Sequence, residues 1–181
     1  MSASRAANAG LAAALRNEFD QAFAVAASTH KVQSSHLLAI RVDANPYAIA
    51  VAEIGGLQVD RVIAPLPTMI GGLLGLAGIR GDLVPVYSLA VLLGYQAPAR
   101  TPRWLALCGG AQSFGLAFDG FERHLNVPVA QIAAADSANS GAAHIRAVVH
   151  NEEGSRPLIS IPSIAVEIAR RCTTAGVSKE N

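Results

Sequence analysis

An uncharged run of 18 residues, from Val62 to Ile79, limits the folds that are open to this chain. Its length would let an α-helix cross a lipid bilayer, but it contains two prolines and four glycines. A helix in lipid must satisfy its backbone hydrogen bonds internally and tolerates such residues only with help from its neighbours. The chain also begins without the basic head and leucine-rich core of a secretory signal. We therefore expect a cytoplasmic protein with no direct membrane insertion.

Short apolar segments bounded by turn residues recur along the rest of the chain. The segment from His36 to Val42 ends at the turn composition Asp-Ala-Asn-Pro, and then Tyr47, Ile49 and Val51 alternate with small residues. Further strands are predicted over residues 83–87, 104–108, 113–118, 145–149 and 158–161. Strands of this length at such intervals are typical of barrels and sandwiches. The sequence therefore predicts a mainly β fold.

The first 35 residues differ from this pattern because they are rich in alanine. Leu11, Leu15, Phe19 and Phe23 recur at the spacing of a helix face. The apolar stripe is narrow, so the segment is predicted to be either a helical extension or a flexible one.

A closing helix is predicted near the other end of the chain. Pro162 occupies a position suited to a first helical turn, and Arg170 and Arg171 would place positive charge at the helix C-terminus, where it complements the helix dipole. The small and polar residues 172–181 are predicted to be a disordered tail. The domain itself then covers residues 36–171.

Charge and cysteine content exclude several classes of function. The chain has 14 basic and 13 acidic residues, so its net charge is +1, and the basic residues are scattered. A nucleic-acid-binding protein would gather them on one face, so no nucleic acid is expected as a partner. Cys108 and Cys172 lack the spacing of a zinc site and are expected to be ordinary reduced thiols. No metal or cofactor is predicted.

The sequence gives only weak evidence for catalytic residues. Ser113 lies in Ala-Gln-Ser-Phe-Gly, in which alanine replaces the first glycine of the nucleophile elbow of hydrolases. The five histidines include no pair at the i, i+4 spacing on an evident helix. A binding module is therefore favoured over an enzyme, and a small serine hydrolase that uses Ser113 stays open as an alternative.

The segment from Gly75 to Leu89, GLAGIRGDLVPVYSL, resembles the signature of the CheW-like domain. In that signature an apolar run leads into Arg-Gly, two variable or apolar residues, and Pro-Val before a leucine. The approach Pro-Leu-Pro at 65–67, the apolar strand at 104–108 and Phe-Gly-Leu-Ala-Phe-Asp at 114–119 are similar to the family in the same order. The resemblance covers about residues 36–171.

This resemblance implies two small intertwined SH3-like five-stranded β-barrels that share a hydrophobic core. Members of the family are non-catalytic adaptors. They join the cytoplasmic tips of methyl-accepting chemoreceptors to the regulatory domain of the histidine kinase CheA, and membrane receptor arrays can recruit them from the cytoplasm. A member could also serve a different sensor kinase.

The resemblance assigns partner binding to Arg80, Gly81 and Pro85, and, as apolar positions only, to Ile54 and Leu57. The chemistry of three of these residues supports their assignment without the family resemblance. Glycine suits a tight turn at position 81, and Arg80 could present its planar donor fork to a partner, although a solvated turn residue is the alternative. Pro85 removes a backbone donor, which predicts an exposed edge on its strand.

Two departures from the family pattern remove charge. Gly55 and Gly56 stand where the family often has an acidic residue, and Ser88-Leu-Ala90 replaces the common Asp-Leu-Arg. We therefore hypothesise that the chain serves a dedicated pathway such as pilus-based motility rather than flagellar steering.

Overall fold

The computed structural model describes residues 33–97, 102–109, 113–135, 144–151 and 154–177. By its internal contacts the chain divides into residues 1–33 and 34–181, and all that follows concerns the second unit. The predicted extension, apart from its last residues, and the end of the predicted tail lie outside the described residues.

The first sheet is built from the two ends of the domain. It has six strands in the order β10-β11-β12-β2-β1-β9. All neighbours are antiparallel except β12 and β2, which pair in parallel at Leu158 and Ala48. The strands are β1 (Ser34–Val42), β2 (Asn45–Ala50), β9 (Gly120–Pro128), β10 (Ile132–Ala134), β11 (Ile145–Asn151) and β12 (Gly154–Ile159).

The second sheet is built from the middle of the chain, in the order β3-β7-β8-β6-β5-β4. Its strands are β3 (Ile54–Val59), β4 (Ile63–Ala64), β5 (Leu73–Ile79), β6 (Asp82–Ser88), β7 (Trp104–Cys108) and β8 (Phe114–Phe118). The helical elements are η1 (Val51–Glu53), α2 (Leu89–Leu92), η2 (Val129–Gln131) and α3 (Ile161–Val177).

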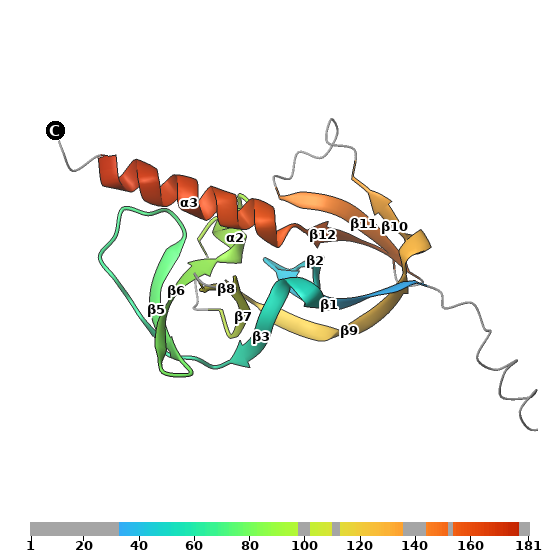
Figure 1. Cartoon of the computed structure of the whole chain (residues 1–181), viewed down its shortest axis with the longest axis horizontal. Coiled ribbons are helices and arrows are strands. Elements are labelled where there is room, and N and C mark those ends of the chain that lie inside the picture. The colour runs from blue at the N-terminus through green and yellow to red at the C-terminus, as the bar shows by residue number, and fades with distance from the viewer. Residues whose placement is uncertain (1–32, 98–101, 110–112, 136–143, 152–153, 178–181) are drawn as a thin grey trace, which may run out of the picture. The chain divides into compact units, whose positions relative to one another are not determined.

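The chain therefore starts in the first sheet, builds the whole second sheet and returns to the first (Figure 1). This route intertwines the two sheets, and the mainly β fold is confirmed. Each sheet has six strands where five were expected. The short edge strands β4 and β10, of two and three residues, account for the difference.

The uncharged run 62–79 forms β4, the loop after it, and β5. Gly75 lets these two strands come close, because a Cβ at this position would lie 2.0 Å from the Ala64 carbonyl oxygen. Within the described residues, no helix has both the length and the apolar character needed to span a bilayer.

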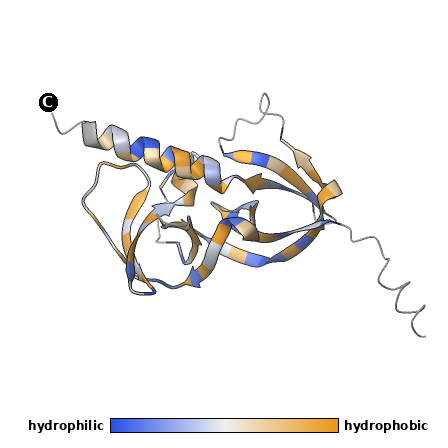
Figure 2. Ribbon diagram, in the orientation of Figure 1, coloured by the Kyte–Doolittle hydropathy of each residue, from blue (hydrophilic) through white to orange (hydrophobic). Residues whose placement is uncertain are grey.

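The main core lies between the two sheets and α3. Fully or almost fully buried side chains from both sheets meet there, among them Ile40, Ile49, Leu116 and Phe118. Two smaller clusters fill the inner faces of the individual sheets. Both hydrophobic and hydrophilic residues occur along β9 (Figure 2), and in its second half Leu125 and Val127 alternate with exposed polar residues, as expected for a strand with one face on a core.

Helix α3 packs into the core that the two sheets share. Ile161, Ile164 and Ile168 recur on one face of the helix and are buried in the main core. At the helix start, the Ile161 N–H donates to Glu53 Oε2 at 3.3 Å, and Glu53 Oε1 also pairs with Arg146 Nη1 at 2.6 Å. One carboxylate from η1 thus ties together the helix and β11.

The helix also runs further than the sequence indicated. It continues through Cys172 to Val177, into the segment assigned to a disordered tail. Arg170 and Arg171 are therefore internal rather than terminal, and both pair with Glu167. These two guanidinium groups, Arg170 first, lower the pKa of Glu167 to about 2.

Candidate interaction surface

The signature residues Arg80 and Gly81 form the tip of the β5–β6 hairpin. Ile79 pairs with Asp82, so the loop between them has two residues. Both have positive φ, +55° at Arg80 and +93° at Gly81, as in a type I′ turn. Glycine, asparagine and aspartate suit this conformation, whereas arginine is strained in it. The prediction of a tight turn at Gly81 is confirmed, and Arg80 occupies its unfavourable first position.

Arg80 lies over β3. A Cβ added at Gly56 would be 3.9 Å from the Arg80 Nη2 atom. Ile54 and Leu57 lie on either side in the same strand, and both are half-buried against the main core. The fold thus brings Arg80 close to β3 at Gly56, whereas Leu57 points from the opposite face of the strand into the main core.

Pro85 lies on a strand that has a neighbour on each side, because β6 lies between β5 and β8. The predicted exposed edge therefore does not extend along the whole strand. Within the described residues, β8 pairs with β6 only from Val86 to Ser88. Pro85 comes immediately before this ladder begins, so its missing N–H is tolerated there.

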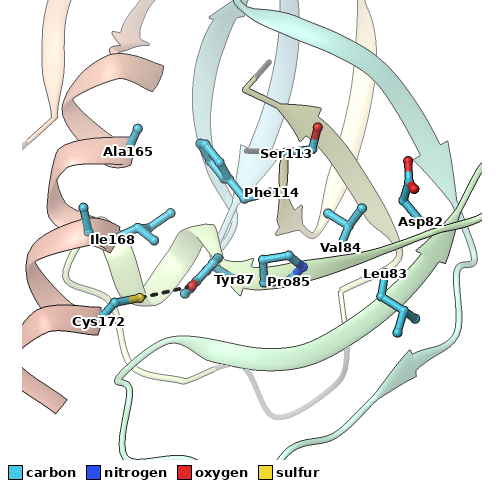
Figure 3. A pocket seen from close by; sticks show the side chains of 11 residues that line it. Asp82, Leu83, Val84, Pro85, Tyr87, Ser113, Phe114, Ala165, Ile168 and Cys172 are labelled. Carbon is cyan, nitrogen blue, oxygen red and sulfur yellow. Dashed lines mark hydrogen bonds between the residues drawn. The ribbon is translucent and has the colours of Figure 1, made fainter. Parts of the chain in front are cut away.

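A groove of about 850 Å³ runs between β6, the start of β8 and α3 (Figure 3). Pro85 and Tyr87 line one side, and Ala165, Ile168 and Cys172 line the other. Tyr87 Oη and Cys172 Sγ are 3.6 Å apart across it. Burial, together with this contact, raises the pKa of Tyr87. The groove is mainly apolar. The sequence predicted the helix that carries Ile168 but assigned Cys172 to the tail, and it gave no signal that this helix faces β6.

The two cysteines are predicted to differ sharply in reactivity. Burial in the main core, with a smaller effect of Glu53, raises the pKa of the Cys108 thiol to about 12, whereas Cys172 is exposed. Since the thiolate is the reactive form, Cys108 is almost fully protonated near pH ~8. A thiol titration of the folded protein is expected to detect one cysteine, and the same titration in denaturant two. Rapid reaction of both in the folded protein would contradict the burial of Cys108.

The alternative of a serine hydrolase gains no support from the position of Ser113. Ser113 lies just before β8, where it lines the groove with Asp82 but, within the described residues, without a histidine. The described residues also contain no cluster of three or more His, Cys, Asp or Glu side chains that could hold a metal.

Ser88 at the end of β6 and Ala90 on α2, the two positions that lack the family's charges, are both buried. Ser88 is fully buried, and its Oγ accepts a hydrogen bond from the Val91 N–H at 3.4 Å, which caps α2. Ala90 is 5% exposed. The side chains at 88 and 90 therefore lie inside the protein and offer little surface for choosing a partner.

Comparisons with known proteins place these features in context. A family model described as "CheW-like domain" matches residues 36–168. No curated protein matches the sequence. Among solved structures, the chain is similar to the scaffolding protein TtCheW from Thermoanaerobacter tengcongensis, with 14% identity and a TM-score of 0.64. The match covers 71% of this chain and 90% of that one. At this identity the likeness concerns the fold.

Proposed function

We propose, from the premise that this chain belongs to the CheW-like domain family, that it is a non-catalytic adaptor in a chemosensory pathway. The match of the family model over residues 36–168 carries the proposal. The partners that the family resemblance implies are the cytoplasmic tip of a chemoreceptor and the regulatory domain of a CheA-type kinase. The adaptor domain, residues 36–171, would act in the cytoplasm and at receptor arrays, in flagellar or pilus-based motility.

The proposed contact region comprises Arg80 and Gly81 at the hairpin tip, Pro85 on β6, and Ile54 and Leu57 on β3. Arg80 is exposed at the hairpin tip, where a guanidinium can orient a charged partner, and Ile54 and Leu57 are half-buried apolar residues of the neighbouring strand β3. The strain at Arg80 supports a functional reason for keeping arginine at that position.

The proposed mechanism is the coupling of kinase activity to the state of the receptor. An adaptor changes kinase activity only if its interface free energy differs between two states of the receptor, because a ligand with equal affinity for both states shifts nothing. No chemistry on the adaptor is needed. Its contribution is to hold the receptor and the kinase in one assembly whose geometry depends on the receptor state.

The test is reconstitution with a receptor cytoplasmic fragment and CheA from the same cell. The protein is expected to co-sediment with both and to raise kinase autophosphorylation. If it binds neither, the proposed function is wrong although the fold stands. Binding to the receptor without stimulation of the kinase would favour a module that does not couple the two.

Arg80→Asn is predicted to separate binding from folding. Asparagine suits the first position of a type I′ turn, so the variant is expected to be at least as stable as the wild type. Loss of the guanidinium is expected to weaken assembly about tenfold, which corresponds to ~1.4 kcal/mol. Co-sedimentation and thermal unfolding measure the two effects.

The matched control is Arg170→Ala, which removes an exposed arginine from α3. It should leave assembly unchanged. Equal losses from both variants would mean that general positive charge, rather than the hairpin tip, supports binding.

A further inference from the structure

The groove beside α3 runs along the edge of a strand. Four consecutive residues of β6, from Asp82 to Pro85, line it (Figure 3). Successive side chains of a strand point to opposite faces of the sheet, so a groove on one face would meet only every second residue. Contact with all four residues therefore places the groove along the lateral edge of β6, where it meets the backbone itself.

This part of β6 pairs on one side only, within the described residues. On that side it pairs with β5, from Asp82 opposite Ile79 onward. On the other side the parallel ladder with β8 begins at Val86, opposite Gly115. A strand that lacks a neighbour leaves alternate N–H and C=O groups unpaired, and another extended segment can bind to these groups as an added strand.

Leu83 supplies the unpaired backbone groups. Ile79 and Asp82 flank the two-residue turn, and residues in this position exchange hydrogen bonds with each other. Since hydrogen-bonded and non-hydrogen-bonded pairs alternate along two antiparallel strands, the N–H and C=O of Leu83 point away from β5 and towards the groove. Pro85 is the next residue to point that way, and it has no N–H to donate. The open edge therefore ends at Pro85.

The wall opposite β6 is apolar. Ala165, Ile168 and Ala169 line the groove from α3. Ala165 and Ala169 are one helical turn apart, so their methyl groups lie on the same face of the helix and leave room for larger side chains of an occupant. Apolar side chains that enter the groove would lose water against this wall, which favours binding.

The two faces of an added strand would meet different surroundings. Leu83, Pro85 and Tyr87 share one face of β6, and Tyr87 Oη lies 3.6 Å from Cys172 Sγ of α3. Asp82 lies on the opposite face, and among the described residues that line the groove it alone is charged. An occupant with apolar side chains on the helix side and a basic side chain on the other side complements both faces.

We infer that the groove binds an extended segment of a partner protein, which pairs with the backbone of Leu83, packs apolar side chains against α3 and presents a basic residue to Asp82. The occupant is a strand and not a helix, because the backbone groups within a helix are already paired. This inference goes beyond the proposed adaptor function, whose contact region shares only Pro85 with the groove.

Fluorescence polarisation with the full chain and synthetic peptides tests the inference. The probe is a fluorescent peptide of alternating valine and threonine, with lysine in place of its central threonine. We expect saturable binding, which is lost when the peptide backbone is N-methylated and is weakened about tenfold when glutamate replaces the lysine. Absence of binding by the probe, or equal binding by its N-methylated form, would overturn the inference.

Ala169→Phe tests the position of the bound peptide. Ala169 is exposed and lines the groove, so phenylalanine would fill the groove without entering the core. Binding is expected to fall about tenfold or more, with thermal unfolding unchanged. The matched control is Val166→Phe, at a 71% exposed position of α3 that does not line the groove. Equal losses from the two variants would contradict binding in the groove.

Asp82→Asn tests the charge at the open edge. It is expected to weaken binding of the lysine peptide about tenfold and to leave the glutamate peptide no weaker than before. Unchanged binding of the lysine peptide would remove Asp82 from the site. Sedimentation equilibrium of the wild type tests the other occupant: self-association that Ala169→Phe abolishes would assign the groove to a second copy and overturn the inference.

Discussion

Gly75→Ala is expected to destabilise the protein by about 3 kcal/mol or more. The backbone φ at Gly75 is +147°, and an added Cβ would lie 2.0 Å from the carbonyl oxygen and 2.7 Å from the carbonyl carbon of Ala64. These are backbone atoms of the neighbouring strand, so β4 would have to move away from β5. Urea denaturation measures the loss as a lower transition midpoint with little change in slope.

The matched control is Gly78→Ala, in the same strand. The space around Gly78 is open, and its φ is not in the left-handed region. This change should alter the free energy of unfolding by no more than about 0.5 kcal/mol. If both variants lost the same stability, the cost would come from placing alanine in β5 and not from the close approach of β4.

Ile164→Ala is expected to cost about 2–5 kcal/mol, because it removes a fully buried side chain and leaves a cavity in the main core. The residue lies on α3, which follows the first sheet in the chain and packs into the core that both sheets share. The loss should therefore appear as one cooperative transition of the whole domain, observed by circular dichroism and by tryptophan fluorescence of Trp104.

Val166→Ala is the control on the same helix. Val166 is 71% exposed, so the substitution removes a similar side chain without creating a cavity. A change within about 0.5 kcal/mol is expected. If Val166→Ala were as destabilising as Ile164→Ala, the loss would not come from core packing, because an exposed position leaves no cavity and alanine forms helices more readily than valine. Two unfolding steps in Ile164→Ala would contradict a core shared by the two sheets.

The strands could be predicted because their signals are local. Alternation such as that of Tyr47, Ile49 and Val51 depends on neighbours in the sequence, and proline, glycine and asparagine interrupt the chain at the turns. The turn at Gly81 could be predicted for the same reason, because it depends mainly on the positive φ of that residue.

Predictions that depended on neighbours distant in the sequence succeeded less often. Pro85 suggested an edge strand, but β8, which the sequence places after β7, covers the second half of β6. Cys172 was assigned to a tail because its neighbours are small and polar, yet α3 extends past it alongside Tyr87. The change at Ser88 and Ala90 led to the hypothesis of a different pathway, yet both residues are buried.

By itself, the sequence determined the mainly β class, the positions of most strands, the hairpin turn and the family resemblance, because each of these follows from residues close together in the chain. The tertiary structure alone decided which surfaces exist. Arg80 meets β3 at Gly56, and Tyr87 meets Cys172 of α3, only after the strands and the helix have packed together. Contacts of this kind depend on strand order and register, which the free energy of the whole core selects and no local pattern encodes.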